Sequence, residues 1–267
     1  MFSKPIRNIT TLVLPVGGLG TRLHPLTIHT PKALVKVAGR PLLDYMLIEA
    51  RDAKIKDVVL VINPSQRAAF EKYVRRSRTL FPSLKFHVRL QHKPLGDGHA
   101  VAQAAEIVKN RPFAVRFCDD IVLGRVPALA SLIAHATRQN GSVILLERVP
   151  KKIVSRYGVV GARKIGKRLY RIFRIVEKPV MKDAPSNLTI VGGYVFMPSI
   201  MRRLKLAVRA LSSKEKDVLR LAFVLEDGLA KKEKIFGWEL EGVRLDCGTL
   251  EGIARAEKYI RKSGKRW

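Results

Sequence analysis

The chain has 267 residues, 47% of them hydrophobic, which is enough to bury the core of one large domain or two small ones and excludes a disordered protein. The 51 lysines and arginines against 22 aspartates and glutamates give a net charge of +29, which attracts polyanions such as nucleotides, sugar phosphates or nucleic acids; a basic solvated surface explains it equally well. No apolar run reaches the ~20 residues that span a bilayer, the N-terminus lacks the apolar centre of a signal peptide, and the two cysteines lie far apart, so we expect a cytoplasmic protein without membrane contact or disulfides.

The first half of the chain alternates apolar, strand-like runs with helical patterns. Strands are expected at 12–16, 57–62, 86–90 and 113–117, and helices at 42–53, 66–76 and 98–108. Strand–helix–strand repetition predicts a mostly parallel sheet with right-handed crossovers.

From residue 142 onward the predicted strands are denser. They cover 142–148, 158–161, 172–177 and 192–197, and a final helix covers 250–261. This half is expected to be mixed sheet plus helices. No repeat or linker interrupts the sequence, so we expect one α/β domain over 1–267.

A glycine-rich loop follows the first predicted strand and contains Gly17, Gly18 and Gly20. Ligands of an open α/β sheet bind beyond the carboxyl ends of its strands, where glycines let backbone N–H groups approach phosphate oxygens. Arg22 and Lys32 would then neutralise anionic charge. The loop lacks the third glycine of the dinucleotide fingerprint and does not match a P-loop, and for the glycines alone a simple turn remains an alternative.

Asp119 and Asp120 follow the predicted strand at 113–117. Adjacent carboxylates repel each other unless a cation is near, and Mg²⁺ takes carboxylate and phosphate oxygens together. A turn or a helix cap is the commoner explanation of an isolated pair of this kind.

Other candidate side chains are polar residues beside predicted strands. The amide of Gln91 suits a uracil edge, although a surface glutamine is the alternative. Glu177 could accept from sugar hydroxyls and Lys178 could contact a sugar phosphate, although such a pair also occurs at ordinary strand ends. The six histidines form no metal-binding motif, and we expect His99 to be structural.

The stretch LPVGGLGTRLHPLTIHTPKAL, residues 14–34, resembles the signature loop of the sugar-1-phosphate nucleotidylyltransferases, L-x-x-G-x-G-T-R-x-x-P-x-T followed by P-K. Members of this family join a nucleoside triphosphate to a sugar 1-phosphate and release pyrophosphate. The resemblance implies the nucleotidyltransferase fold, a Rossmann-like three-layer sandwich around a mostly parallel mixed sheet. It also implies a nucleotide-binding half at about 1–125, and a sugar-binding half with a C-terminal helix at about 126–267.

Further stretches resemble the bacterial-type UTP–glucose-1-phosphate uridylyltransferases within that family. They read QHKPLGDGHAVAQA at 91–104, RFCDDIVL at 116–123, VSRYGVVG at 154–161, RIVEKPVMKDAPSNLTIVGGYVF at 174–196 and LDCGT at 245–249. The resemblance implies transfer of uridylyl from UTP to glucose 1-phosphate, giving UDP-glucose and pyrophosphate, with Mg²⁺ as cofactor.

The resemblance also implies a role for each matched residue. Nucleotide contacts are expected from Gly17, Gly18, Gly20, Thr21, Arg22, Gln91 and Gly96, and catalytic roles for Arg22, Lys32, Asp119 and Lys178. Sugar-phosphate contacts are expected from Gly158, Glu177, Lys178 and Val191, and metal coordination from Asp119 and Asp246.

The sequence departs from the family in places. The usual P-K-E-M-L-P reads PKALVK at 31–36, Ile28 stands where a lysine is frequent, and E-I-Q-L-T-D-A is replaced by DVLRLAFVLE at 217–226. The resemblance implies a homo-oligomer, a dimer or tetramer. Because the last of these regions is involved in subunit packing in the family, we expect the contacts between subunits to differ from those of the family.

Three alternatives stay open. The first is a thymidylyl or other nucleotidylyltransferase acting on a different sugar 1-phosphate, since uracil and thymine differ by one methyl group. The second is a regulatory homologue, against which the retention of the expected catalytic residues argues. The third is a basic nucleic-acid-binding protein, against which the 7% aromatic content and the lack of an RNA-binding fingerprint argue.

Overall fold

The computed structural model describes residues 9–211 and 218–263. Their strands are β1 (Thr11–Pro15), β2 (Lys36–Val37), β3 (Arg40–Pro41), β4 (Asp57–Ile62), β5 (Lys85–Leu90), β6 (Phe113–Arg116), β7 (Asp120–Leu123), β8 (Ser142–Arg148), β9 (Gly158–Gly166), β10 (Leu169–Glu177), β11 (Leu188–Phe196), β12 (Ile235–Glu239) and β13 (Val243–Asp246). The α-helices are α1 (Leu42–Asp52), α2 (Arg67–Leu80), α3 (Asp97–Ala102), α4 (Ala105–Val108), α5 (Ala128–Gln139), α6 (Pro198–Ala210), α7 (Leu221–Ala230) and α8 (Leu250–Ser263).

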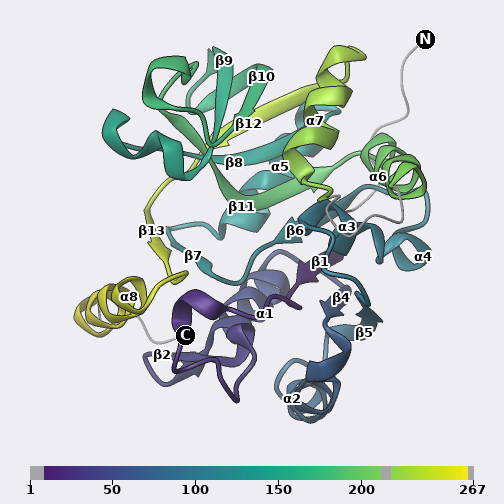
Figure 1. Cartoon of the computed structure of the whole chain (residues 1–267), viewed down its shortest axis with the longest axis vertical. Helices are drawn as coiled ribbons and strands as arrows, with labels where there is room; N and C mark the ends of the chain where they lie inside the picture. The colour runs from purple at the N-terminus through teal and green to yellow at the C-terminus, as the bar shows by residue number, and fades with distance from the viewer. Residues whose placement is uncertain (1–8, 212–217, 264–267) are drawn as a thin grey trace.

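A nine-stranded sheet in the order β5-β4-β1-β6-β11-β8-β12-β10-β9 forms the centre of this fold (Figure 1). The first-half strands β5, β4, β1 and β6 pair in parallel, as expected. The second half is mixed, because β11 runs antiparallel to β6 and β8, whereas β8 and β12 are parallel. β7 and β13 form a separate antiparallel pair.

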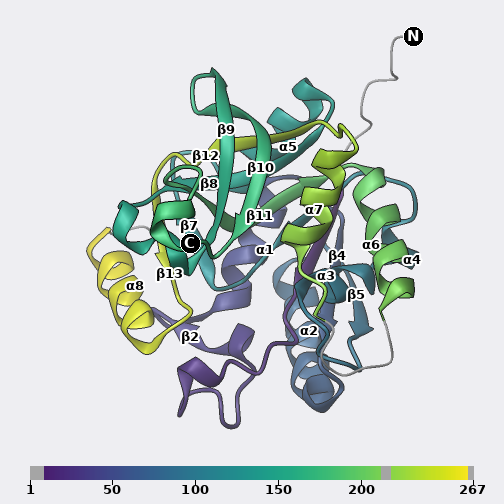
Figure 2. The same cartoon turned by 45° about the horizontal axis from the view of Figure 1, so that its top comes forward.

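The two faces of the sheet are covered by different helices. On one face α1, α2 and α5 pack with Leu12, Leu14 and Leu60, and on the other α3, α6 and α7 pack with Val13 and Val59. Because both faces of the central strands are buried, those strands read as continuous apolar runs. The expected three-layer α/β sandwich is confirmed, and Figure 2 shows α6 and α7 in front of the sheet with α1 behind it.

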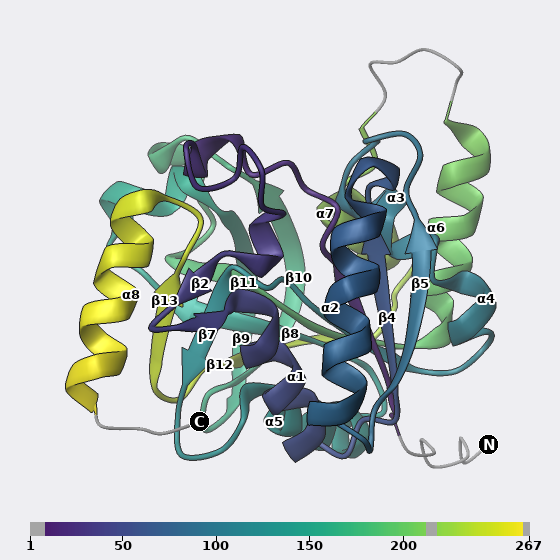
Figure 3. The same cartoon turned by 90° about the horizontal axis from the view of Figure 1, so that it is seen from below.

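Some elements differ from the sequence prediction. The helix expected at 98–108 is two short helices, α3 and α4, separated at Gln103 and Ala104. Strands β9 and β10 are both longer than expected. The outer part of β9 is exposed and carries Arg163 and Lys164 instead of an apolar run, whereas β10 begins earlier than expected, at the buried Leu169. The final helix α8 packs on β13 at one edge of the molecule (Figure 3). Among the described residues, no helix has the length and apolar character needed to cross a bilayer.

A buried ion pair joins the helix layer to the centre of the sheet. Arg116, at the end of β6, is fully buried, and its Nε lies 2.9 Å from Oε2 of Glu49 on α1. Its other nitrogens donate to the carbonyl oxygens of Gly192 (3.0 Å) and Asp120 (2.8 Å). Glu49 also accepts from the backbone N–H of Leu129 at 2.8 Å. This network therefore fixes the chain around Asp119 and Asp120.

Replacing Glu49→Gln is expected to lower the free energy of unfolding by about 3–5 kcal/mol, because it leaves the buried Arg116 cation without a counter-charge. Urea denaturation measures the change. The matched control is Glu71→Gln, which removes the exposed partner of Arg67 and should cost less than about 1 kcal/mol. Equal losses in the two variants would contradict a special role for the buried pair.

Candidate functional site

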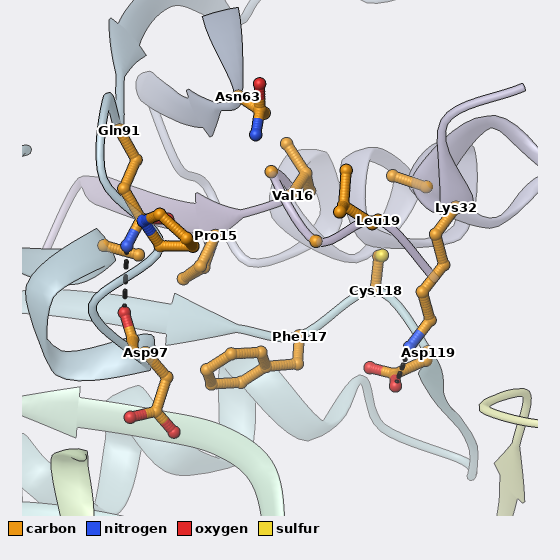
Figure 4. A pocket seen from close by; sticks show the side chains of 16 residues that line it. Pro15, Val16, Leu19, Lys32, Asn63, Gln91, Asp97, Phe117, Cys118 and Asp119 are labelled. Carbon is orange, nitrogen blue, oxygen red and sulfur yellow. Dashed lines mark hydrogen bonds and ion pairs between the residues drawn. The ribbon is translucent and has the colours of Figure 1, made fainter. Parts of the chain in front are cut away.

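A cavity of ≈ 340 Å³ opens beyond the carboxyl end of β1 and is called here the glycine-loop cavity. Figure 4 shows Gln91 and Asp97 at one end, and Lys32 and Asp119 reaching toward each other at the other end. Its lining contains six of the predicted site residues: Gly17, Gly18, Lys32, Gln91, Gly96 and Asp119. Predicted site residues from four separate segments of the sequence therefore line one cavity.

The three loop glycines differ in the space around them and in their backbone conformation. A Cβ on Gly17 would lie 2.7 Å from the backbone nitrogen of Asn63, so the adjoining strand end leaves no room for a side chain. Gly18 has nothing within 4 Å of its Cβ position and faces the open cavity. Gly20 has a φ of +68°, which favours glycine, and its carbonyl accepts from the Thr27 hydroxyl at 2.8 Å. Only Gly18 has the open space that a ligand needs.

Gln91 is held at the far end of this cavity. Its Nε2 donates to the carbonyl oxygen of Gly96 at 3.0 Å and lies 3.1 Å from Nδ1 of His99. Burial lowers the pKa of His99, which favours the neutral ring. His99 therefore positions Gln91, in agreement with the structural role expected for it.

Glycine is required at position 96 because of its backbone conformation and because another part of the chain packs against it. Its φ is +98°, and a Cβ there would lie 2.5 Å from the carbonyl oxygen of Leu219. A nucleotide contact was expected for this glycine, but the atom closest to its Cβ position belongs to Leu219. Gly96 nevertheless lines the glycine-loop cavity.

Lys32 and Asp119 form an ion pair at the floor of the cavity. Burial disfavours both charges, but each partner stabilises the other. The pKa of Lys32 is therefore raised above its ordinary value, and the pKa of Asp119 is lowered by Lys32 although burial alone would raise it.

Asp120 points away from Asp119 and has its own cation. Its Oδ1 lies 2.6 Å from Nε of Arg244, and its Oδ2 accepts from the backbone N–H of Gly192 at 2.9 Å. Burial raises the pKa of Asp120, although Arg244 opposes this shift. The adjacent carboxylates therefore face different cations, although the charge of Asp119 still helps to raise the pKa of Asp120.

Arg244 is a functional-site residue that the sequence analysis missed. Besides Asp120, its guanidinium contacts the carboxylates of Glu147 (3.1 Å) and Asp246 (3.3 Å), and it lies 5.1 Å from the ring centroid of Tyr157. The sequence feature that could have indicated Arg244 is its position two residues before Asp246, because alternate residues of a strand share one face.

Asp119 and Asp246 approach one space next to Gly248. The Cβ position of Gly248 lies 3.0 Å from Oδ1 of Asp246, 3.6 Å from Oδ2 of Asp119 and 3.8 Å from Nη2 of Arg22. The antiparallel pairing of β7 with β13 creates this convergence. No cluster of three or more metal-binding side chains occurs among the described residues, and two carboxylates suit Mg²⁺, which also takes phosphate oxygens and water.

A second cavity, of ≈ 160 Å³, is called here the Glu177–Lys178 cavity. Gly158, Glu177 and Lys178, all predicted to contact a sugar phosphate, line it. Val191 is fully buried in β11 and is absent from this lining, whereas its neighbour Ile190 is present.

The remaining predicted nucleotide contacts lie outside the glycine-loop cavity. Gly20 supports the turn, and Thr21 lines a neighbouring cavity of ≈ 420 Å³ that shares Leu19 with it. Arg22 lies beside Gly248, near the two carboxylates.

The segment expected to take part in subunit packing has contacts within the chain. Asp217 lies outside the described residues. Leu219 pairs with the loop around Gly96, and Leu221, Ala222 and Leu225 line the Glu177–Lys178 cavity. The departure from the family sequence therefore alters the candidate site itself.

Gly17→Ala is expected to lower the free energy of unfolding by about 1–3 kcal/mol, because the new methyl group would collide with backbone atoms of Ile62 and Asn63. Gly18→Ala adds the same group in open space and should change stability by less than about 0.5 kcal/mol. Urea denaturation of the two variants compares them directly, and equal losses would contradict this description of the loop.

Lys32→Met should lower stability at neutral pH, because the partly buried Asp119 would then lose its cation. A carboxyl group whose pKa is lower in the folded state stabilises the fold at pH values above its unfolded-state pKa of about 3.9. This stabilisation is lost as the pH falls through the folded-state pKa. Without Lys32, burial alone would raise the pKa of Asp119, so the stability gap between wild type and Lys32→Met should begin to narrow above about pH 4 and continue to narrow below it.

Urea denaturation across the pH range measures that gap, with Lys36→Met, at an exposed lysine, as the control. A gap that stays constant from neutral pH to well below about pH 4 would refute the pairing.

Comparisons with known proteins agree with this arrangement. Residues 11–263 match the Nucleotidyl transferase family. A UTP–glucose-1-phosphate uridylyltransferase of Bacillus subtilis (strain 168) is 30% identical over 266 residues, covering 93% of this chain and 89% of the relative.

Two solved structures have the same fold over nearly the whole chain. A UDP-glucose pyrophosphorylase in its apo form has a TM-score of 0.87 and 26% identity, covering 96% of this chain and 99% of that one. A UDP-glucose pyrophosphorylase complexed with UDP-glucose has a TM-score of 0.85 and 27% identity, covering 96% and 100%. Because the family match covers nearly the whole described chain and the Bacillus subtilis relative is 30% identical over 93% of it, this chain belongs to the nucleotidyl transferase family.

Proposed function

We propose that this protein transfers uridylyl from UTP to glucose 1-phosphate, forming UDP-glucose and pyrophosphate. The names of the relatives support these substrates. The single observation that carries the proposal is that the two cavities lie next to each other. Asp97 lines both cavities, and the consecutive residues Asp119 and Asp120 line one each.

The two cavities support a division of labour between the halves of the chain. Every lining residue of the glycine-loop cavity falls between Pro15 and Asp119. Apart from Asp97 and Asp120, the lining residues of the Glu177–Lys178 cavity fall between Arg156 and Arg244. We therefore assign nucleotide binding to about 1–125 and sugar binding to about 126–267.

Positioning and charge neutralisation would drive the reaction. The phosphate of the sugar attacks the α-phosphorus of UTP, and pyrophosphate leaves from the opposite side. The attacking oxygen is already anionic, so no strong general base is needed. Holding two anions in an aligned geometry can supply about 7–11 kcal/mol of the barrier reduction.

The basic side chains have distinct assignments. Arg22 and Lys32 would neutralise the triphosphate, and Lys178 the sugar phosphate, while Glu177 accepts from sugar hydroxyls. The carboxylates of Asp119 and Asp246 would hold Mg²⁺, which when bound supplies positive charge to the phosphate oxygens. In the structure Lys32 is paired with Asp119, the carboxylate assigned to Mg²⁺. When metal and nucleotide bind, the ammonium group of Lys32 can move from this carboxylate to a phosphate oxygen.

The experiment that tests the proposed function measures pyrophosphate release with glucose 1-phosphate and Mg²⁺ for UTP, dTTP, GTP, CTP and ATP in turn. Release with UTP is expected. Release with dTTP instead would place the protein in the thymidylyl branch of the family. Both nucleotides are tested because one methyl group changes the binding free energy of a base by only about 1–3 kcal/mol. No release with any of the five would contradict the proposal for this sugar phosphate.

Asp119→Asn should reduce turnover at least about 100-fold, because it removes a negative charge from the place where metal and phosphates meet. Steady-state kinetics at saturating Mg²⁺ measure the loss, and circular dichroism checks the fold. Asp52→Asn, at an exposed carboxylate of α1, should retain wild-type turnover. Full activity of Asp119→Asn would refute the assignment of Asp119 as a metal ligand.

A further inference from the structure

The described part of the segment that departs from the family pattern connects the two cavities. The N–H of Leu219 donates to the carbonyl oxygen of Leu95 at 2.8 Å, and the N–H of Gly98 donates to the carbonyl oxygen of Leu219 at 2.9 Å. Two residues later, the N–H of Leu221 donates to Oδ1 of Asp97 at 2.8 Å. The backbone on both sides of Arg220 is therefore fixed to the loop that contains Gly96.

Arg220 projects from this fixed backbone into the Glu177–Lys178 cavity. Its Nη1 lies 3.4 Å from Oε1 of Glu177, and its side chain is 42% exposed. A charge-assisted hydrogen bond is normally 2.7–2.9 Å long, as a general range, so this pair is loose. The guanidinium is therefore available to a closer anionic partner.

Three other cations line this cavity, and each has a different environment. Arg156 is exposed, and its guanidinium carbon lies 6.0 Å from the ring centroid of Tyr157. Arg244 already contacts three carboxylates, those of Asp120, Glu147 and Asp246. Lys178 is the residue assigned to the sugar phosphate. Arg220 adds a planar group with several donors, which can bind a phosphate or a carboxylate through two parallel hydrogen bonds.

We propose that Arg220 is an additional substrate-binding residue, which leaves Glu177 and binds an anionic group of the sugar substrate. Glu177 is then free to accept from sugar hydroxyls. The inference rests on the proposed function and goes beyond the family pattern, since E-I-Q-L-T-D-A contains no arginine. The anionic group is the phosphate of any sugar 1-phosphate or the carboxylate of a hexuronic acid 1-phosphate.

Steady-state kinetics with glucose 1-phosphate and with glucuronic acid 1-phosphate test this role. Arg220→Gln should raise the KM of the sugar substrate about 10-fold or more, while the KM of UTP stays unchanged. Arg220→Lys should fall between wild type and Arg220→Gln. The matched control is Arg67→Gln, which removes the same charge from an exposed pair on α2 and should behave as wild type.

The two sugar substrates identify the anionic group. A raised KM for both indicates the phosphate, and a raised KM for glucuronic acid 1-phosphate alone indicates the carboxylate. Unchanged KM values for both would overturn the proposal. An equal rise in the KM of UTP would also overturn it, because it would show that Arg220 acts only through the loop around Gly96.

Measurements in a Glu177→Gln background separate direct binding from support of Glu177. Direct binding predicts that Arg220→Gln raises the KM again in this background. No further change would overturn the proposal, because Arg220 would then act only through Glu177.

A failure of the proposed function can be distinguished from a failure of this inference. If the wild-type protein turns over neither sugar phosphate with any nucleotide, calorimetry with glucose 1-phosphate and with glucuronic acid 1-phosphate still tests Arg220. Weaker binding of either by Arg220→Gln than by Arg67→Gln supports its role. Equal binding by the two variants, or no binding to any of the proteins, overturns it.

Discussion

Asp119 and Asp120 lie side by side in the sequence at the junction of two cavities, and the site depends on how their charges are neutralised. Lys32 contacts the first and Arg244 the second, so that each carboxylate faces a different direction. Behind them Arg116 and Glu49 fix the backbone from inside the core. A change to any of these cations would leave a buried or partly buried carboxylate uncompensated, which is more costly than the loss of an exposed ion pair.

A second constraint couples the halves of the chain. The backbone of Leu219 packs so closely against Gly96 that no side chain fits there, and Asp97 accepts from the N–H of Leu221. The loop that positions Gln91 and the segment that carries Arg220 are therefore one structural unit. Asp97, which lines both cavities, belongs to this unit.

The fold and much of the site could be predicted from local patterns. Buried strands such as β4 read as unbroken apolar runs, and the glycine loop and the Asp119–Asp120 pair stand in recognisable motifs. The exposed half of β9 lacks an apolar pattern, and the break between α3 and α4 has no glycine or proline to indicate it. Arg244 and Arg220 were missed because their roles come from long-range contacts, with Asp120 and Glu177, that a single sequence does not reveal.

The central claim is that the two cavities hold their substrates close enough for one direct displacement at the α-phosphorus. The stereochemical course of the reaction with a single diastereomer of the α-thio analogue of UTP tests it most directly. A single in-line displacement predicts inversion of configuration at the α-phosphorus of the product. Retention would contradict the account, because it requires two successive displacements through a covalent intermediate on the protein.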